Sequence, residues 1–180
     1  MKLPSREECL KLLKKYGVLP NILEHMLVVN KLANHLAKKL KAAGIKIDLD
    51  VVDRAALVHD IAKSEELKTD RAKGKDDIHH IIGEEILKKE GYPELGKVVR
   101  RHSLRELSKL ETWEEKVVNY ADTRVKHTEV VSLRERLDDL NKRYNIPLKD
   151  RAPERDIFAL EKEIYDKLDE KPEDLKNVIK

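Results

Sequence analysis

Residues 55–63 read AALVHDIAK, an apolar segment that is interrupted by one histidine and one carboxylate. The apolar residues before His59 follow helical spacing, and Asp48 or Asp50 can cap the helix that they form. A charged Asp60 in so apolar a segment is costly unless it is paired or bound to a cation. The segment therefore predicts a core helix that ends in a candidate cation-binding group.

The rest of the chain also follows a helical period, with Gly and Pro between the periodic segments. We expect further helices over about residues 5–15 with a Ser5/Glu8 capping box, 21–43 capped by Asn21, 77–90, 93–102 and 113–127, and two more in the tail, one with Leu133, Leu137, Leu140 and Tyr144 on one face and one starting at Pro153. Residues 64–77 are polar and charged, which predicts a mobile loop. No strand pair is evident, so the predicted fold class is all-α.

Length and composition indicate one globular domain with an appendage. The chain has 180 residues, of which 40% are hydrophobic and 41% charged, which excludes a disordered chain. We expect a domain over residues 1–127 and a helical extension over residues 128–180 that packs on it. The 38 basic and 35 acidic residues nearly cancel, and the excess of +3 is spread along the chain, which argues against a dedicated nucleic-acid binder.

Two sequence features bear on where the protein works. The single cysteine, Cys9, cannot form an intrachain disulfide, which fits a reducing, cytoplasmic compartment. No run approaches the ~18 apolar residues of a membrane span, and the first residues do not resemble a signal peptide. We therefore expect no membrane partner.

Two further helices bring metal-competent groups toward the core. His25 lies on the apolar face of residues 21–43, and Asp122 lies in the apolar stretch VVNYADTRV. Imidazole and carboxylate ligands together suit Fe, Mn, Co, Ni or Zn. Taken singly, His25 is more typical of a core histidine than of a ligand, and Asp122 could be a buried partner of Arg124 or of an adjacent lysine. Together with His59 and Asp60, they favour a metal site.

In this order and helical context, His25, His59-Asp60 and Asp122 resemble the HD-domain metal-dependent phosphohydrolase superfamily. AALVHDIAK is similar to the family's apolar helix ending in HD, and the resemblance covers roughly residues 18–127. It implies an HD-domain helical bundle, here with a C-terminal helical extension. Ala62 and Ser64 depart from the family pattern, but neither position supplies a ligand.

The segments around His79 and His102 resemble those of the HD subgroup that holds two metals. By this resemblance, His25, His59, Asp60 and Asp122 bind a first divalent transition metal. His79 and His102 join Asp60 at a second, where Mg²⁺ is an alternative.

The resemblance also implies hydrolysis of a phosphate ester or anhydride, most typically of a nucleotide or dinucleotide, by metal-activated hydroxide. His59, Asp60 and Lys63 are the implied catalytic residues. Candidate contacts to the substrate phosphate are Lys63, Arg100, Arg101, Arg124 and Lys126.

Two other functions remain open at this stage: a non-catalytic nucleotide-binding HD signalling module, and a nucleic-acid-binding helical protein. The tail over residues 128–180 is a packed appendage, a homodimer contact or a lid over the cleft. Of the other histidines, His80 is expected behind the ligands or at the surface, and His35 and His127 in solvent.

Overall fold

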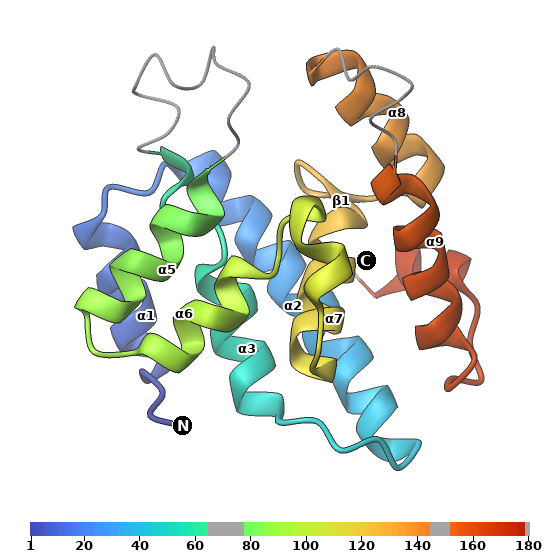
Figure 1. Cartoon of the computed structure of the whole chain (residues 1–180), viewed down its shortest axis with the longest axis horizontal. Helices are drawn as coiled ribbons and strands as arrows, with labels where there is room; N and C mark the ends of the chain where they lie inside the picture. Colours follow the sequence, from blue (N-terminus) through green and yellow to red (C-terminus); the bar gives the residue numbers. More distant parts are fainter. Residues whose placement is uncertain (65–77, 145–151, 179–180) are drawn as a thin grey trace.

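The computed structural model describes residues 1–64, 78–144 and 152–178, and Figure 1 shows their arrangement. The elements are α1 (Arg6–Lys15), α2 (Pro20–Ala42), α3 (Leu49–Val58), α5 (His79–Lys89), α6 (Pro93–Arg100), the 3-10 helix η2 (Leu104–Lys109), α7 (Trp113–Thr123), β1 (Val125–Lys126), β2 (Glu129–Val130), α8 (Leu133–Tyr144), α9 (Ala152–Tyr165) and the 3-10 helix η4 (Pro172–Asn177). The predicted all-α class is confirmed, with one short hairpin added in the described residues.

The long helix α2 forms the centre of the bundle, where it packs against α3 and α7. Its buried stripe includes Met26, Leu32 and Leu36, none of which is exposed. The N-cap lies two residues earlier than expected, at Leu19, and Pro20 takes the first helical position. Asn21 therefore lies inside the first turn and does not cap it.

Side-chain caps fix the starts of two helices that the sequence predicts. The Ser5 hydroxyl accepts from the backbone N–H of Glu8 while Glu8 accepts from that of Ser5, so the capping box of α1 is confirmed. The Asp48 carboxylate accepts from the backbone of Asp50 and Val51 and starts α3. This helix delivers residues 59 and 60 to the middle of the bundle.

Close approach of α5 and α6 positions the two later histidines. A Cβ added at Gly96 would meet the carbonyl oxygen of Glu84 at 3.0 Å, so a larger residue there would push the two helices slightly apart. Gly91, with φ of +88°, ends the helical run before Pro93 starts α6. As a result His79, the first residue of α5, faces His102, which follows α6.

Helix α7 is shorter than expected: it ends at Thr123 and not at residue 127. The chain turns instead into a hairpin in which Val125 pairs with Val130 and Lys126 with Glu129. His127 forms the turn in the left-handed region, with φ of 54°. Backbone pairing therefore replaces the last helical turn that the apolar pattern suggested.

The C-terminal helices pack on the same bundle, and Figure 1 shows them at one side of it. Helix α9 contacts α7 and η2 and buries Ile157, Leu160 and Ile164. The division at residue 127 stays a prediction.

The expected loop at 64–77 lies outside the described residues, apart from Ser64, which is buried. Among the helices of the described part of the chain, none has both the length and the apolar character that crossing a bilayer requires.

Candidate metal centre

His25 projects from the second turn of α2, and its ring is held by the hairpin. Its Nδ1 lies 2.8 Å from the carbonyl oxygen of His127. Because a carbonyl oxygen can only accept, Nδ1 carries the proton and Nε2 keeps its lone pair. That Nε2 lies 2.9 Å from Oδ1 of Asp122, a group that also accepts.

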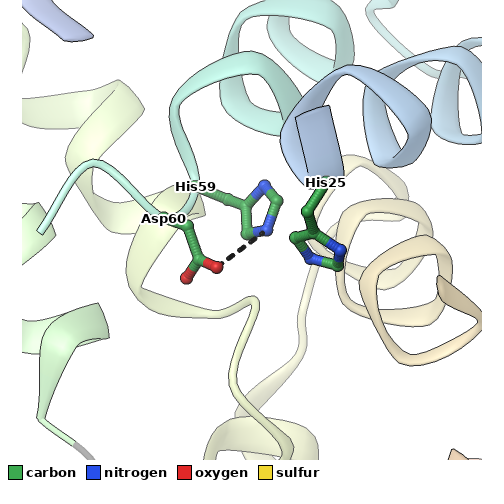
Figure 2. Close-up of side chains that lie close together, drawn as sticks. All are labelled: His25, His59 and Asp60. Atoms are coloured by element: carbon green, nitrogen blue, oxygen red, sulfur yellow. Dashed lines mark ion pairs between the residues drawn. The ribbon is translucent and has the colours of Figure 1, made fainter. Parts of the chain in front are cut away.

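His59 repeats this arrangement at the end of α3. Its Nδ1 donates to the carbonyl oxygen of Ala56 at 2.9 Å, which leaves the lone pair on Nε2. This Nε2 is fully buried and has no hydrogen-bond partner among the described residues. It lies 3.4 Å from Oδ1 of Asp122 and 3.7 Å from Oδ2 of Asp60. Figure 2 shows the rings of His25 and His59 beside the Asp60 carboxylate.

His79 and His102 lie beside the other oxygen of the Asp60 carboxylate, Oδ1. Nδ1 of His102 donates to the Val99 carbonyl oxygen at 2.6 Å, so its Nε2 also presents a lone pair, 3.5 Å from Oδ1 of Asp60. Nε2 of His79 lies 3.0 Å both from the same Oδ1 and from Nε2 of His102. The Asp60 carboxylate thus stands between two groups of imidazoles.

The directions of the pKa shifts indicate that the two buried carboxylates, Asp60 and Asp122, require positive charge nearby. Burial raises the pKa of Asp60, but its interactions with His59 and His79 outweigh burial and hold that pKa well below its usual range. Asp122 behaves likewise, because contacts with His25 and His59 outweigh its burial and lower its pKa. Burial lowers the pKa of His59, yet Asp60 and Asp122 raise it more. A divalent cation between these atoms meets the same demand.

The residues present therefore fit a metal. Two groups of three residues each bring their ligand atoms within 4.8 Å of one another. The first group is His25, His59 and Asp60, and the second is Asp60, His79 and His102. Backbone carbonyls orient three of the four imidazoles by binding Nδ1, which is the usual support of metal-binding histidines. Burial lowers the pKa of His102, so this imidazole stays in the neutral form that binds metals.

A cavity of about 320 Å³ opens onto this group, at the small end of small-molecule sites. Its described lining is formed by Asn21, Ile22, Glu24, His25, Asp60, Lys63, His79, His102, Ser103, Leu104, Asp122, Thr123, His127, Thr128, Arg136, Leu140 and Arg143. Five of the six predicted metal ligands are among these residues, and His59 lies buried behind them. Their role as ligands stays a prediction, but the structure brings them together.

Four of the five cations predicted to contact substrate lie elsewhere; only Lys63 lines the cavity. Arg124 is corrected most clearly, since its side chain is 2% exposed and its donors reach the Val131 and Pro172 carbonyl oxygens and Glu161. Residues that are two positions apart in a helix point to nearly opposite sides, so the Arg124 side chain points away from the face that carries Asp122.

The other three predicted cations have acidic partners outside the cavity lining. Arg100 donates to Glu84 at 2.9 Å, Arg101 pairs with Glu106, and Nζ of Lys126 lies 3.4 Å from Asp139. Each charge is thereby partly neutralised where it stands. The expectation that proximity in sequence to a ligand places a cation at the substrate is wrong for Arg100 and Arg101 in this arrangement.

Sequence reasoning missed Arg136 and Arg143, which reach the cavity from α8. It also missed His127, whose exposed side chain lines the cavity while its carbonyl holds His25. No local pattern marks these residues, because only tertiary packing brings α8 and the hairpin to the site.

His35 was expected in solvent but is partly buried, and His80 lies in the interior. His80 is buried, with Nε2 3.8 Å from Glu106, and His35 pairs with Glu170 at 3.3 Å. Burial raises the pKa of the Cys9 thiol to about 11, so this residue is not a nucleophile.

Comparison with known protein families matches residues 22–143 to the HD domain. The chain belongs to the HD domain family. The match runs from the helix of His25 into α8, and it confirms the resemblance that the histidine and aspartate pattern indicated. HD domains bind divalent metals, in agreement with the two ligand groups described above.

Similar proteins include one of unassigned function and two that are named as tRNA methyltransferases. A protein of Methanocaldococcus jannaschii, named only as uncharacterized, is 31% identical over 139 residues, which are 69% of this chain and 75% of that protein. The tRNA (cytidine(56)-2'-O)-methyltransferases of Thermoplasma volcanium and Picrophilus torridus are 29% and 30% identical over 156 and 151 residues. These matches span 78% and 76% of this chain but only 42% and 40% of the methyltransferases. No solved structure matches the chain.

Proposed function

We propose that the protein is a metal-dependent phosphohydrolase that cleaves a phosphate ester or anhydride, most typically of a nucleotide. The observation that carries the proposal is the convergence of three imidazole lone pairs, from His25, His59 and His102, on the carboxylates of Asp60 and Asp122. Such a set binds one or two divalent transition metals beside a cavity of small-molecule size.

When bound, such a cation polarises a phosphoryl oxygen and acidifies a coordinated water. The protein's own residues hold the cation, orient the substrate and neutralise its negative charge. Asp60 lies within reach of both histidine groups, so its carboxylate would help to hold an ion at either of them. Lys63 lines the cavity and is suited to contact a substrate phosphate as a point charge. The apolar side chains of Ile22, Leu104 and Leu140 offer a surface for the rest of the substrate.

Metal analysis and phosphate release test this function together. Protein purified without chelator is expected to hold one or two equivalents of metal and to release phosphate from members of a nucleotide panel. Asp60→Asn is expected to lose both properties. His35→Gln is the matched control, since His35 is a partly buried histidine outside the cavity. Absence of metal after anaerobic loading with Fe, Mn, Co, Ni and Zn would sink the proposal.

The complete ligand set favours an enzyme over the alternative of a non-catalytic nucleotide-binding module. A second candidate substrate class is RNA-linked phosphate, which is favoured by the similarity to proteins named as tRNA methyltransferases. One assay distinguishes the two substrate classes. If RNA is the substrate, it inhibits nucleotide hydrolysis at concentrations close to its own Kd for the protein. The lone buried Cys9 fits a reducing cytoplasmic location.

A further inference from the structure

One wall of the cavity is formed by α8 and is rich in positive charge. Arg136, Leu140 and Arg143 share one face of this helix, at spacings of four and three residues, and all three line the cavity. Lys126 of β1 approaches the same place, since its Nζ lies 3.4 Å from Oδ1 of Asp139. Three cations from two elements therefore gather around one carboxylate beside the metal centre.

Asp139 neutralises only part of this charge. Arg143 pairs with its Oδ2, and Nη1 of Arg136 lies 3.3 Å from the same oxygen. Burial raises the pKa of Asp139, but Arg143 and Lys126 outweigh it and lower that pKa, so the carboxylate is ionised. Because Arg136 and Arg143 share this single carboxylate, the wall keeps an excess of positive charge, which attracts an anion.

Arg136 has a donor to spare for such an anion. Its side chain is only 13% exposed, and its Nε is buried with no hydrogen-bond partner among the described residues. A buried N–H without a partner is costly, and a phosphate oxygen satisfies it. The planar guanidinium also matches the spacing of two phosphate oxygens, which a lysine does not. Arg124, whose donors are used within the protein, shows by contrast how a purely structural arginine is bound here.

The predicted metal ligands other than His59 face the same cavity as Arg136 and Arg143, from different elements. We propose that Arg136, supported by Arg143, binds a phosphate group of the substrate other than the one held at the metal centre. The inference rests on the proposed function, because that function requires the phosphate group at the metal centre. It narrows the substrate class to compounds with at least two phosphate groups, such as nucleoside polyphosphates or dinucleotides.

Binding of two base-free probes, inorganic phosphate and tripolyphosphate, tests the inference without any need for hydrolysis. Each is titrated calorimetrically into the full chain with its resident metal. Excess magnesium in the buffer limits extraction of that metal by tripolyphosphate, and elemental analysis after each titration verifies that it is retained. The wild type is expected to bind tripolyphosphate at least tenfold more tightly than phosphate.

Arg136→Gln is expected to weaken tripolyphosphate binding roughly tenfold and phosphate binding much less, because a charge-assisted hydrogen bond is lost only from the longer probe. Arg136→Lys restores the charge and recovers part of the preference. Lys142→Gln is the matched control, since it removes one positive charge from an exposed position of the same helix. This control keeps the wild-type preference.

Asp139→Asn gives an independent variant in case Arg136→Gln folds poorly. It removes the carboxylate that competes for both arginines, so tripolyphosphate binding is expected to tighten severalfold. Equal affinity for both probes in the wild type overturns the inference. So does a preference that survives in Arg136→Gln, or one that Lys142→Gln loses to the same extent. A protein that shows the Arg136-dependent preference yet hydrolyses no phosphate compound refutes the proposed function and leaves the binding site standing.

Discussion

The ammonium nitrogen of Lys63 lies 3.1 Å from Nδ1 of His79. Because an ammonium group only donates, Nδ1 accepts, and the ring proton of His79 then sits on Nε2, where Asp60 and His102 receive it. A metal at this second group needs that Nε2 lone pair. His25, His59 and His102 already present their lone pairs, so the two metal groups are not equivalent.

We therefore predict that the first metal, at His25 and His59, binds more tightly than the second. Lys63→Met removes the donor that holds His79 in the other tautomer, and we expect it to tighten the second metal severalfold while it lowers turnover. Metal titrations followed by calorimetry, together with steady-state kinetics, separate the two effects. Equal affinities in wild type and variant would contradict this relation between Lys63 and His79.

Metal removal is expected to lower stability. A ligand that binds only the folded protein stabilises it by about 2.7 kcal/mol at a hundredfold excess over Kd. Chelation should therefore lower the Tm of the wild type, as measured by calorimetry, and metal addition should restore it. In Asp122→Asn the same chelator is expected to leave the Tm nearly unchanged, because this variant loses a carboxylate that faces both His25 and His59.

Arg124 is predicted to matter for stability and not for phosphate binding. Its guanidinium is buried and joins α7 to Glu161 of α9 and to the Pro172 carbonyl oxygen. Arg124→Met removes the donor to the Pro172 carbonyl oxygen and the positive charge that pairs with Glu161, and it is expected to cost about 3 kcal/mol. Urea unfolding measures this loss. At a temperature where the variant is folded, its preference for tripolyphosphate over phosphate should equal that of the wild type.

Glu106 gives a pH-dependent contribution to stability. Burial raises the pKa of this carboxyl, but Lys109 and Arg101 outweigh it, so the folded-state pKa lies below the usual value of 4.5. The ion pairs therefore stabilise the fold fully above about pH 4.5, and the contribution is lost as pH falls through the folded-state pKa. Glu106→Gln should be less stable near neutral pH and should approach the wild type in acid. A difference in the free energy of unfolding between wild type and variant that stays the same at all pH values would contradict this role of Glu106.

Much of the site was predictable because its residues carry local signals. His25, His59, Asp60 and Asp122 are polar residues on apolar helical faces, where a buried charge calls for a partner. The helix starts at Ser5 and Asp48 were predictable because their caps involve residues only two or three positions away.

The cationic side of the cavity was not predictable in the same way. Arg100 and Arg124 each lie two residues from a proposed ligand, a spacing that places them on the opposite face of a helix. Arg136 reaches the cavity only because α8 returns over it, which depends on contacts far apart in the sequence. A chain with 38 basic residues offers too many candidates for sequence proximity alone to choose among them.

The grip on His25 comes from the peptide carbonyl of His127, and the side chain at this position contributes nothing to it. Because His127 has φ of 54°, asparagine and glycine are at ease there and would present the same oxygen. A replacement of the side chain at position 127 therefore leaves this hydrogen bond to His25 in place, whatever it changes in the cavity lining. The orientation of His25 therefore depends on the path of the main chain through the hairpin. A change in the length of the hairpin would disturb it, because the carbonyl oxygen of residue 127 would move away from the imidazole.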